Sequence, residues 1–133
     1  MASHYLVDAH SQEADRRMAT HPLVYLTPFH RAEMMHAVNQ QVFRGNIPSQ
    51  KAELCWRDFE QDCLTGIWAA VNLPEKSFIR CIEIARSHVA TLGVRTLDSL
   101  HVACALELRA QRFWTFDERQ ARLAEAVGLD TTS

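Results

Sequence analysis

Short apolar runs alternate along this chain with longer segments of helical spacing, and this alternation constrains the fold more than any other feature. Residues 23–26 (LVYL) and 112–116 (RFWTF) have the length and composition of buried strands. Each is followed by a segment whose apolar residues recur every three or four positions. Strands that alternate with helices predict an α/β fold, a three-layer α/β/α sandwich with a parallel central sheet.

Helix boundaries can be read from local signals. Thr27 followed by Pro28 predicts a helix start, because threonine caps exposed amides and proline suits the first turn. Gly45, Gly93 and Gly128 predict helix ends, and a last helix is expected from Glu118. The expected buried faces consist of Met35, Val38 and Val42; Ala52, Cys55, Phe59 and Cys63; Phe78, Ile82, Ala85 and Val89; and, from a helix opening at Thr96, Leu97, Leu100, Cys104 and Leu108.

Composition narrows the class of protein. With 133 residues, 47% of them hydrophobic, residues 1–133 suit one compact domain. The formal charge of −2 provides no general attraction for nucleic acid or membranes. Twelve arginines stand against two lysines, a bias compatible with phosphate contacts and equally with a GC-rich genome. No apolar run is long enough to span a membrane, and the start lacks the basic and apolar regions of a signal peptide.

The cysteines and histidines offer no zinc site. The four cysteines form no CxxC pair, and each lies in a helix-like segment: Cys55, Cys63, Cys81 and Cys104. They are expected to be the reduced, buried cysteines of a cytoplasmic protein. The seven histidines form neither HExxH nor a Cys/His cluster.

Three carboxylates occupy comparable positions. Glu33 lies in the first turns of a helix after a strand, Asp98 in the first turn of another helix, and Asp117 directly after the run 112–116. Functional groups of α/β sheets collect where strands end and helices begin. Converging carboxylates would repel one another by about 4 kcal/mol per close pair at moderate dielectric. A cation would offset this, and oxygen ligands favour Mg²⁺ or Mn²⁺.

Each acid also has a simpler explanation. Asp98 and Asp117 are ordinary helix-start residues that bind free amides and complement the helix dipole. Glu33 fits a solvated helix position equally well. Spacing alone therefore leaves both interpretations open.

Three motifs then show a resemblance. Residues 95–129 (RTLDSLHVACALELRAQRFWTFDERQARLAEAVGL) resemble the C-terminal half of PIN-domain proteins of the VapC-like toxin type. Residues 26–38 (LTPFHRAEMMHAV) resemble the second acidic motif of that family. The family pattern D-x-x-H-x-A is matched by Asp98, His101 and Ala103, and the pattern T-x-D by Thr115 and Asp117. The resemblance covers roughly residues 20–130.

The resemblance implies a ribonuclease that depends on Mg²⁺ or Mn²⁺. By matched position, Glu33, Asp98 and Asp117 would be catalytic metal ligands, directly or through water, and Thr115 would support them by hydrogen bonding. His101 is expected to pack within its helix rather than to catalyse. Candidates for holding RNA phosphates are Arg31, Arg95 and Arg119, for which pairing with the carboxylates is the alternative. The family further implies a toxin that forms a homodimer and binds an antitoxin protein over its acidic pocket.

The N-terminal segment HYLVDAHSQEADRRM can be aligned with the family in two ways. In one, residues 5–7 are the first strand, Asp8 is the family's fourth acid and a short crossover helix spans residues 12–19. In the other, which we favour, the segment matches the family's next helix, and the first strand and its aspartate are absent through truncation. The missing acid would weaken metal binding and cleavage. A non-catalytic PIN-like module is therefore the alternative to the nuclease, and an unrelated α/β protein with capping acids is the third hypothesis.

Overall fold

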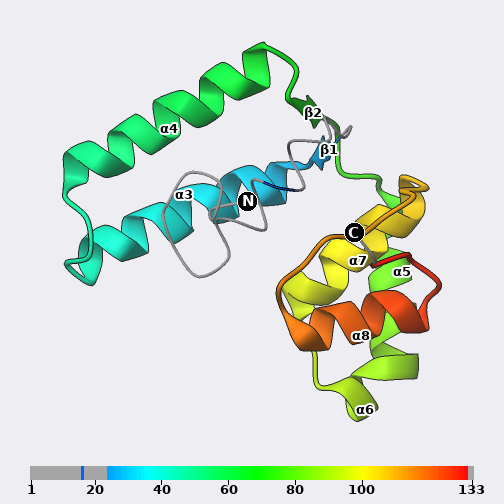
Figure 1. Ribbon diagram of the computed structural model, residues 1–133. Helices are drawn as coiled ribbons and strands as arrows, with labels where there is room; N and C mark the ends of the chain where they lie inside the picture. Colours follow the sequence, from blue (N-terminus) through cyan, green and yellow to red (C-terminus); the bar gives the residue numbers. More distant parts are fainter. Residues whose placement is uncertain (1–15, 17–23, 132–133) are drawn as a thin grey trace. The chain divides into compact units, whose positions relative to one another are not determined.

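The computed structural model of the chain describes residue 16 and residues 24–131 (Figure 1). These residues form two compact units, one ending at Asn72 and the other beginning at Leu73. The possible first strand at residues 5–7, Asp8, and all of the proposed helix 12–19 except residue 16 lie outside the described residues. The two N-terminal alignments therefore remain predictions.

The first unit is built on a pair of parallel strands. β1 (Val24–Leu26) and β2 (Trp68–Ala70) pair with Val24 opposite Trp68 and Leu26 opposite Ala70. Two helices connect them, α3 (Pro28–Phe43) and α4 (Ser49–Leu64), which lie side by side in Figure 1. The predicted strand is confirmed for Val24–Leu26, and the predicted parallel pairing is confirmed as well, whereas β2 was not predicted.

The first helix begins and ends as predicted. Thr27 is the N-cap of α3, Pro28 is its first residue, and the Thr27 amide donates a 3.0 Å hydrogen bond to Nδ1 of His30. The expected buried face was wrong at one position, because Met34 is buried and Met35 is exposed. The core of the first unit consists of Leu26, Met34, Val38, Ala52, Cys55, Phe59 and Trp68.

The second unit is helical. Its elements are α5 (Lys76–Ile84), the π-helical turn η1 (Ala85–Val89), α6 (Ala90–Leu92), α7 (Thr96–Glu107) and α8 (Glu118–Ala126). α7 is central, since it packs against both α5 and α8 and is buried from Ser99 to Ala105. The core residues of this unit are Ile84, Val94, Val102, Ala103, Ala105, Leu123, Ala124 and Leu129.

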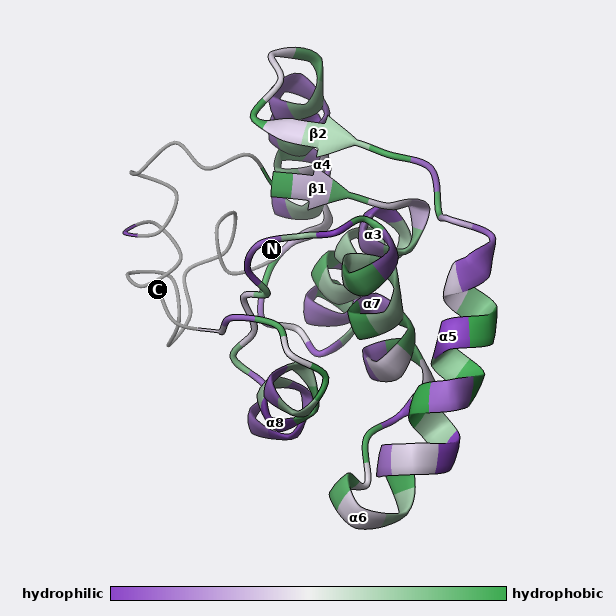
Figure 2. Ribbon diagram, turned by 90° about the vertical axis from the view of Figure 1, so that its right-hand side faces the viewer, coloured by the Kyte–Doolittle hydropathy of each residue, from purple (hydrophilic) through white to green (hydrophobic). Residues whose placement is uncertain are grey.

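The predicted buried face of α5 was wrong. Phe78 and Ile82 are exposed, and the buried residues of this helix are Ser77 and Ile84. Apolar and polar residues alternate along α5 in Figure 2, so apolar spacing alone does not identify its packed side. α5 packs on α7 through a side that includes the small residue Ser77, which permits close approach of the two helices. Leu97 was likewise expected to be buried and is 46% exposed in the first turn of α7.

The predicted strand 112–116 does not form. Within the described residues, the segment makes one isolated bridge, between Arg112 and Asp130, and the Phe113 amide donates to the Asp130 carbonyl at 2.8 Å. A strand needs a ladder of partners, and a single bridging residue after α8 does not provide one. Asp117 therefore follows a segment without regular secondary structure rather than a sheet strand.

The cysteines are free, as expected, but not equally buried. Cys55 and Cys104 are buried, whereas Cys63 and Cys81 are half-buried, which corrects the prediction for these two. Burial raises the pKa of all four thiols. In the described part of the chain, none of the helices combines the length and apolar character of a membrane span.

Candidate functional site

Two of the three predicted acids line one pocket of the second unit. The pocket has a volume of about 290 Å³, and both Asp98 and Asp117 contribute to its wall. Its other lining residues are Gly93, Val94, Arg95, Glu118 and Arg119. The pocket is thus formed by the turn that precedes α7 and by the beginnings of α7 and α8.

Local geometry explains how the turn reaches the pocket. Gly93 is the C-cap of α6, and its φ of +66° lies in the left-handed region that glycine adopts without steric cost. Val94 is then buried in the core, and Arg95 in extended conformation is the N-cap of α7. Asp98 follows in the first helical turn, half-buried.

Asp117 is the N-cap of α8. Its Oδ1 atom accepts a 2.8 Å hydrogen bond from the Gln120 amide, the usual contact of a capping carboxylate. The Asp117 amide in turn donates to the Thr115 hydroxyl at 3.0 Å. One carboxylate oxygen is thus held by the helix, which fixes the orientation of the whole group at the pocket wall.

Gln120 joins these segments. Both ends of its side-chain amide are hydrogen-bonded. The Thr115 hydroxyl donates to Oε1 at 2.7 Å, and Nε2 donates to the Asp98 backbone carbonyl at 3.2 Å. The residue is only 8% exposed. Sequence analysis did not identify Gln120, and its only signal was its position three residues after Asp117, where the third amide of a capped helix lies.

The charges at the pocket are partly compensated. The positive ends of α7 and α8 favour carboxylates in their first turns, where Asp98 and Glu118 lie. Glu118 is additionally paired with Arg122 one turn along α8, at 2.6 Å. Arg95 and Arg119 line the pocket beside the two aspartates, so the pocket presents both signs of charge.

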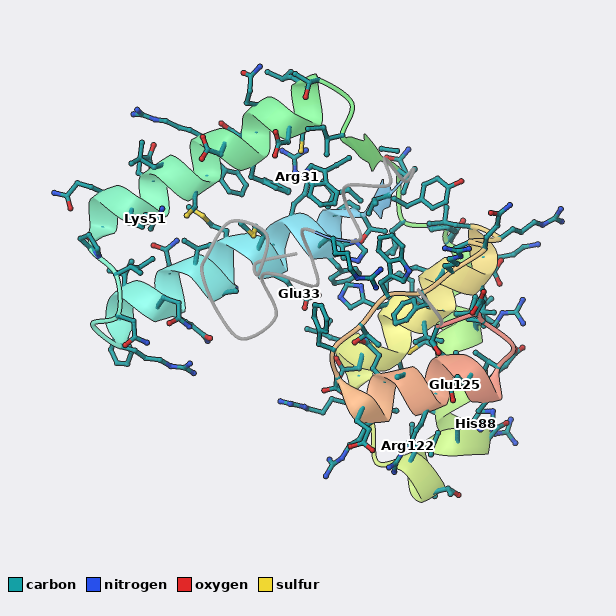
Figure 3. All side chains as sticks on the ribbon, viewed as in Figure 1. Arg31, Glu33, Lys51, His88, Arg122 and Glu125 are labelled. Atoms are coloured by element: carbon teal, nitrogen blue, oxygen red, sulfur yellow. The ribbon has the colours of Figure 1, made fainter. Side chains whose placement is uncertain are left out.

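Glu33 and Arg31 belong to the first unit. Both are exposed on α3, and two residues along a helix correspond to a rotation of about 200°. Figure 3 accordingly shows them on opposite sides of α3. Arg31 extends toward α4, where its charge opposes the rise that burial causes in the pKa of Cys63. Of the predicted phosphate-binding arginines, Arg95 and Arg119 line a pocket together with two predicted acids.

The donor set of the pocket fits a hard divalent cation in part. In the described residues of either unit, no three His, Cys, Asp or Glu side chains are grouped closely enough to form a metal site. Asp98 and Asp117 nevertheless supply carboxylate oxygens at one pocket, and Mg²⁺ is commonly held by one or two carboxylates with water in its other positions. His101, 9% exposed within α7, is a packed residue and does not line the pocket.

Comparisons with known proteins identify the family of this chain. The sequence model of the family described as PIN domain matches residues 3–126, nearly the whole chain. A comparison with curated proteins finds no match. PIN domains are α/β proteins, in agreement with the predicted fold class and the parallel strands of the first unit, and they are generally nucleases that use divalent metals. The chain therefore belongs to the PIN domain family.

Proposed function

We propose that this protein is an endoribonuclease that requires Mg²⁺ or Mn²⁺. The observation that supports this most directly is the joint pocket of Asp98 and Asp117 at the starts of two helices. Membership of a nuclease family supports the same activity. Both aspartates also match the acidic motifs that the sequence shares with VapC-like toxins.

The two aspartates have complementary roles in this proposal. Asp117, whose Oδ1 accepts from the Gln120 backbone amide, would offer its second oxygen to a cation, and Asp98 on α7 would supply a further carboxylate. Glu33 is proposed as a third ligand because of its motif on α3, and Asp8 as a fourth if the first alignment holds. A bound divalent cation lowers the pKa of water and neutralises charge on the scissile phosphate.

Arg95 and Arg119 are proposed to bind the RNA backbone. Their guanidinium groups offer planar pairs of donors that suit phosphate oxygens. Because both residues line the pocket, a phosphate held by them would lie next to the aspartates. Arg31 on α3 is the weaker candidate, since it extends toward α4 and Cys63.

The biological setting is proposed from the resemblance to VapC-like proteins. In this setting the protein is a cytoplasmic toxin, forms a homodimer, and is inhibited by an antitoxin protein that covers the acidic pocket.

The activity can be tested with single-stranded RNA and Mn²⁺. We expect cleavage by the wild-type chain, and a loss of at least 100-fold in Asp98→Asn and in Glu33→Gln. Asp58→Asn is the matched control, because it makes the same chemical change on an exposed position of α4. Equal cutting by wild type and Asp98→Asn would identify a contaminating nuclease. Absence of cutting by the pure wild-type chain at millimolar Mn²⁺ would favour the non-catalytic module.

A further inference from the structure

The side chain of Gln120 links the two acidic segments of the second unit. Nε2 donates to the backbone carbonyl of Asp98 on α7, and Oε1 accepts from Thr115, the residue whose hydroxyl also receives the Asp117 amide. The backbone amide of Gln120 donates to the carboxylate of Asp117 itself. One residue therefore contacts the segments of both pocket aspartates at the same time.

The hydrogen bonds of the Gln120 side chain are chemically feasible and difficult to replace with water. A carbonyl oxygen has two lone pairs, so a carbonyl within α7 can accept a side-chain donor in addition to a helix bond. Gln120 is 8% exposed, so little water is available to replace either hydrogen bond if its side-chain amide is removed. The start of α7 and the cap of α8 would then lose a direct polar connection.

We infer that Gln120 is a positioning residue that sets the separation of Asp98 and Asp117 for a divalent cation. This inference rests on the proposed function, since it concerns the same pocket. Gln120 itself is not among the residues that line the pocket, so its effect on a cation would be exerted through the two aspartates. A hard cation of small radius demands closely defined ligand positions, and groups that orient metal ligands strongly affect affinity.

Mn²⁺ binding to the full chain, measured by isothermal titration calorimetry, tests this role. Gln120→Met keeps the length of the side chain and the backbone bond to Asp117 but removes both side-chain hydrogen bonds. We expect its Kd for Mn²⁺ to rise about ten-fold or more, the range found when a group that orients a metal ligand is removed. Leu129→Ala is the control for lost stability, because Leu129 is a core residue of the same unit outside the pocket. It is expected to unfold more easily and to bind Mn²⁺ as the wild type does.

Thr115→Val provides a second variant on the same network. It removes the hydroxyl that donates to Gln120 and accepts from the Asp117 backbone amide. Because the bond between Thr115 and Gln120 is lost in both single variants, their effects should be less than additive in the double variant. The positioning role is overturned by an unchanged Kd in Gln120→Met beside a wild type that binds, by an equal rise in Leu129→Ala, or by fully additive effects. A wild-type chain that binds no Mn²⁺ overturns the proposed function, and the role of Gln120 with it.

Discussion

Oδ1 of Asp117 lies 2.8 Å from the backbone nitrogen of Gln120, so this carboxylate caps α8 while it lines the acidic pocket. Capping and metal binding are therefore compatible functions of one side chain, because a carboxylate has two oxygens and the helix uses one. The two functions can be separated by substitution.

Asp117→Asn should retain the fold and lose the activity. Asparagine caps a helix about as well as aspartate, so the free energy of unfolding should change by less than about 0.5 kcal/mol, whereas Asp117→Ala should lose about 1 kcal/mol. Both variants should lose RNA cleavage, because neither supplies a second carboxylate oxygen. Urea unfolding and cleavage assays on the same preparations measure the two effects. Cleavage by Asp117→Asn at the wild-type rate would leave Asp117 with the capping role alone.

Divalent metal should stabilise the protein. Mn²⁺ that binds the folded pocket and not the unfolded chain raises the melting temperature, by an amount that grows with the logarithm of metal concentration above Kd. The rise should be smaller in Asp98→Asn, which lacks one proposed ligand, and unaltered in Asp58→Asn. Scanning fluorimetry at Mn²⁺ concentrations from 0.1 to 10 mM, in roughly ten-fold steps, measures this rise in melting temperature. Superimposable melting curves with and without metal would contradict an assembled site.

The sequence predicted the helices of this chain better than its strands. Thr27, Pro28 and Gly45 act through local backbone preferences, so the bounds of α3 could be inferred without knowledge of the fold. β2 has only three residues, and nothing local distinguishes it from other short apolar segments. The run 112–116 has strand composition but only a bridging partner, Asp130, in the described residues, and pairing depends on residues distant in sequence.

The candidate site was predictable in part for the same reason. The positions of Asp98 and Asp117 at helix starts are visible in the sequence, whereas the pocket that they share also depends on the packing of α8 against α7. Gln120 was not predictable, since its link to the Asp98 carbonyl spans 22 positions and depends on the packing of α8 against α7. The exposure of Phe78 likewise depends on which side of α5 meets α7.

Arg119 should contribute to RNA affinity through a phosphate contact. Arg119→Gln is expected to weaken binding of a single-stranded RNA and to reduce the slope of log Kd against log salt by about 0.7, the value for one phosphate contact. Arg57→Gln is the matched control, because Arg57 is exposed on α4 and pairs with Glu53. Fluorescence anisotropy across a salt series, with Ca²⁺ in place of Mn²⁺ to prevent cleavage, gives both quantities. An identical slope in Arg119→Gln and wild type would exclude the contact.

Arg109→Gly should stabilise the protein. Arg109 has a φ of +55°, and it ends α7 with the Arg109 amide bonded to the Leu106 carbonyl and the Ala110 amide to the Ala105 carbonyl. Gly45, Gly66 and Gly128 occupy the same left-handed position after α3, α4 and α8, with the same pair of hydrogen bonds.

A residue with a side chain pays about 1–2 kcal/mol for this left-handed conformation, and glycine avoids that cost. Part of the gain is offset because glycine loses more conformational freedom when the chain folds. A net increase of about 0.5–1 kcal/mol in the free energy of unfolding is therefore expected from urea titration. Arg44→Gly is the control, because Arg44 has a φ of −75° and gains nothing from glycine. If both variants lose stability alike, the side chain of Arg109 makes a contact that outweighs its backbone strain.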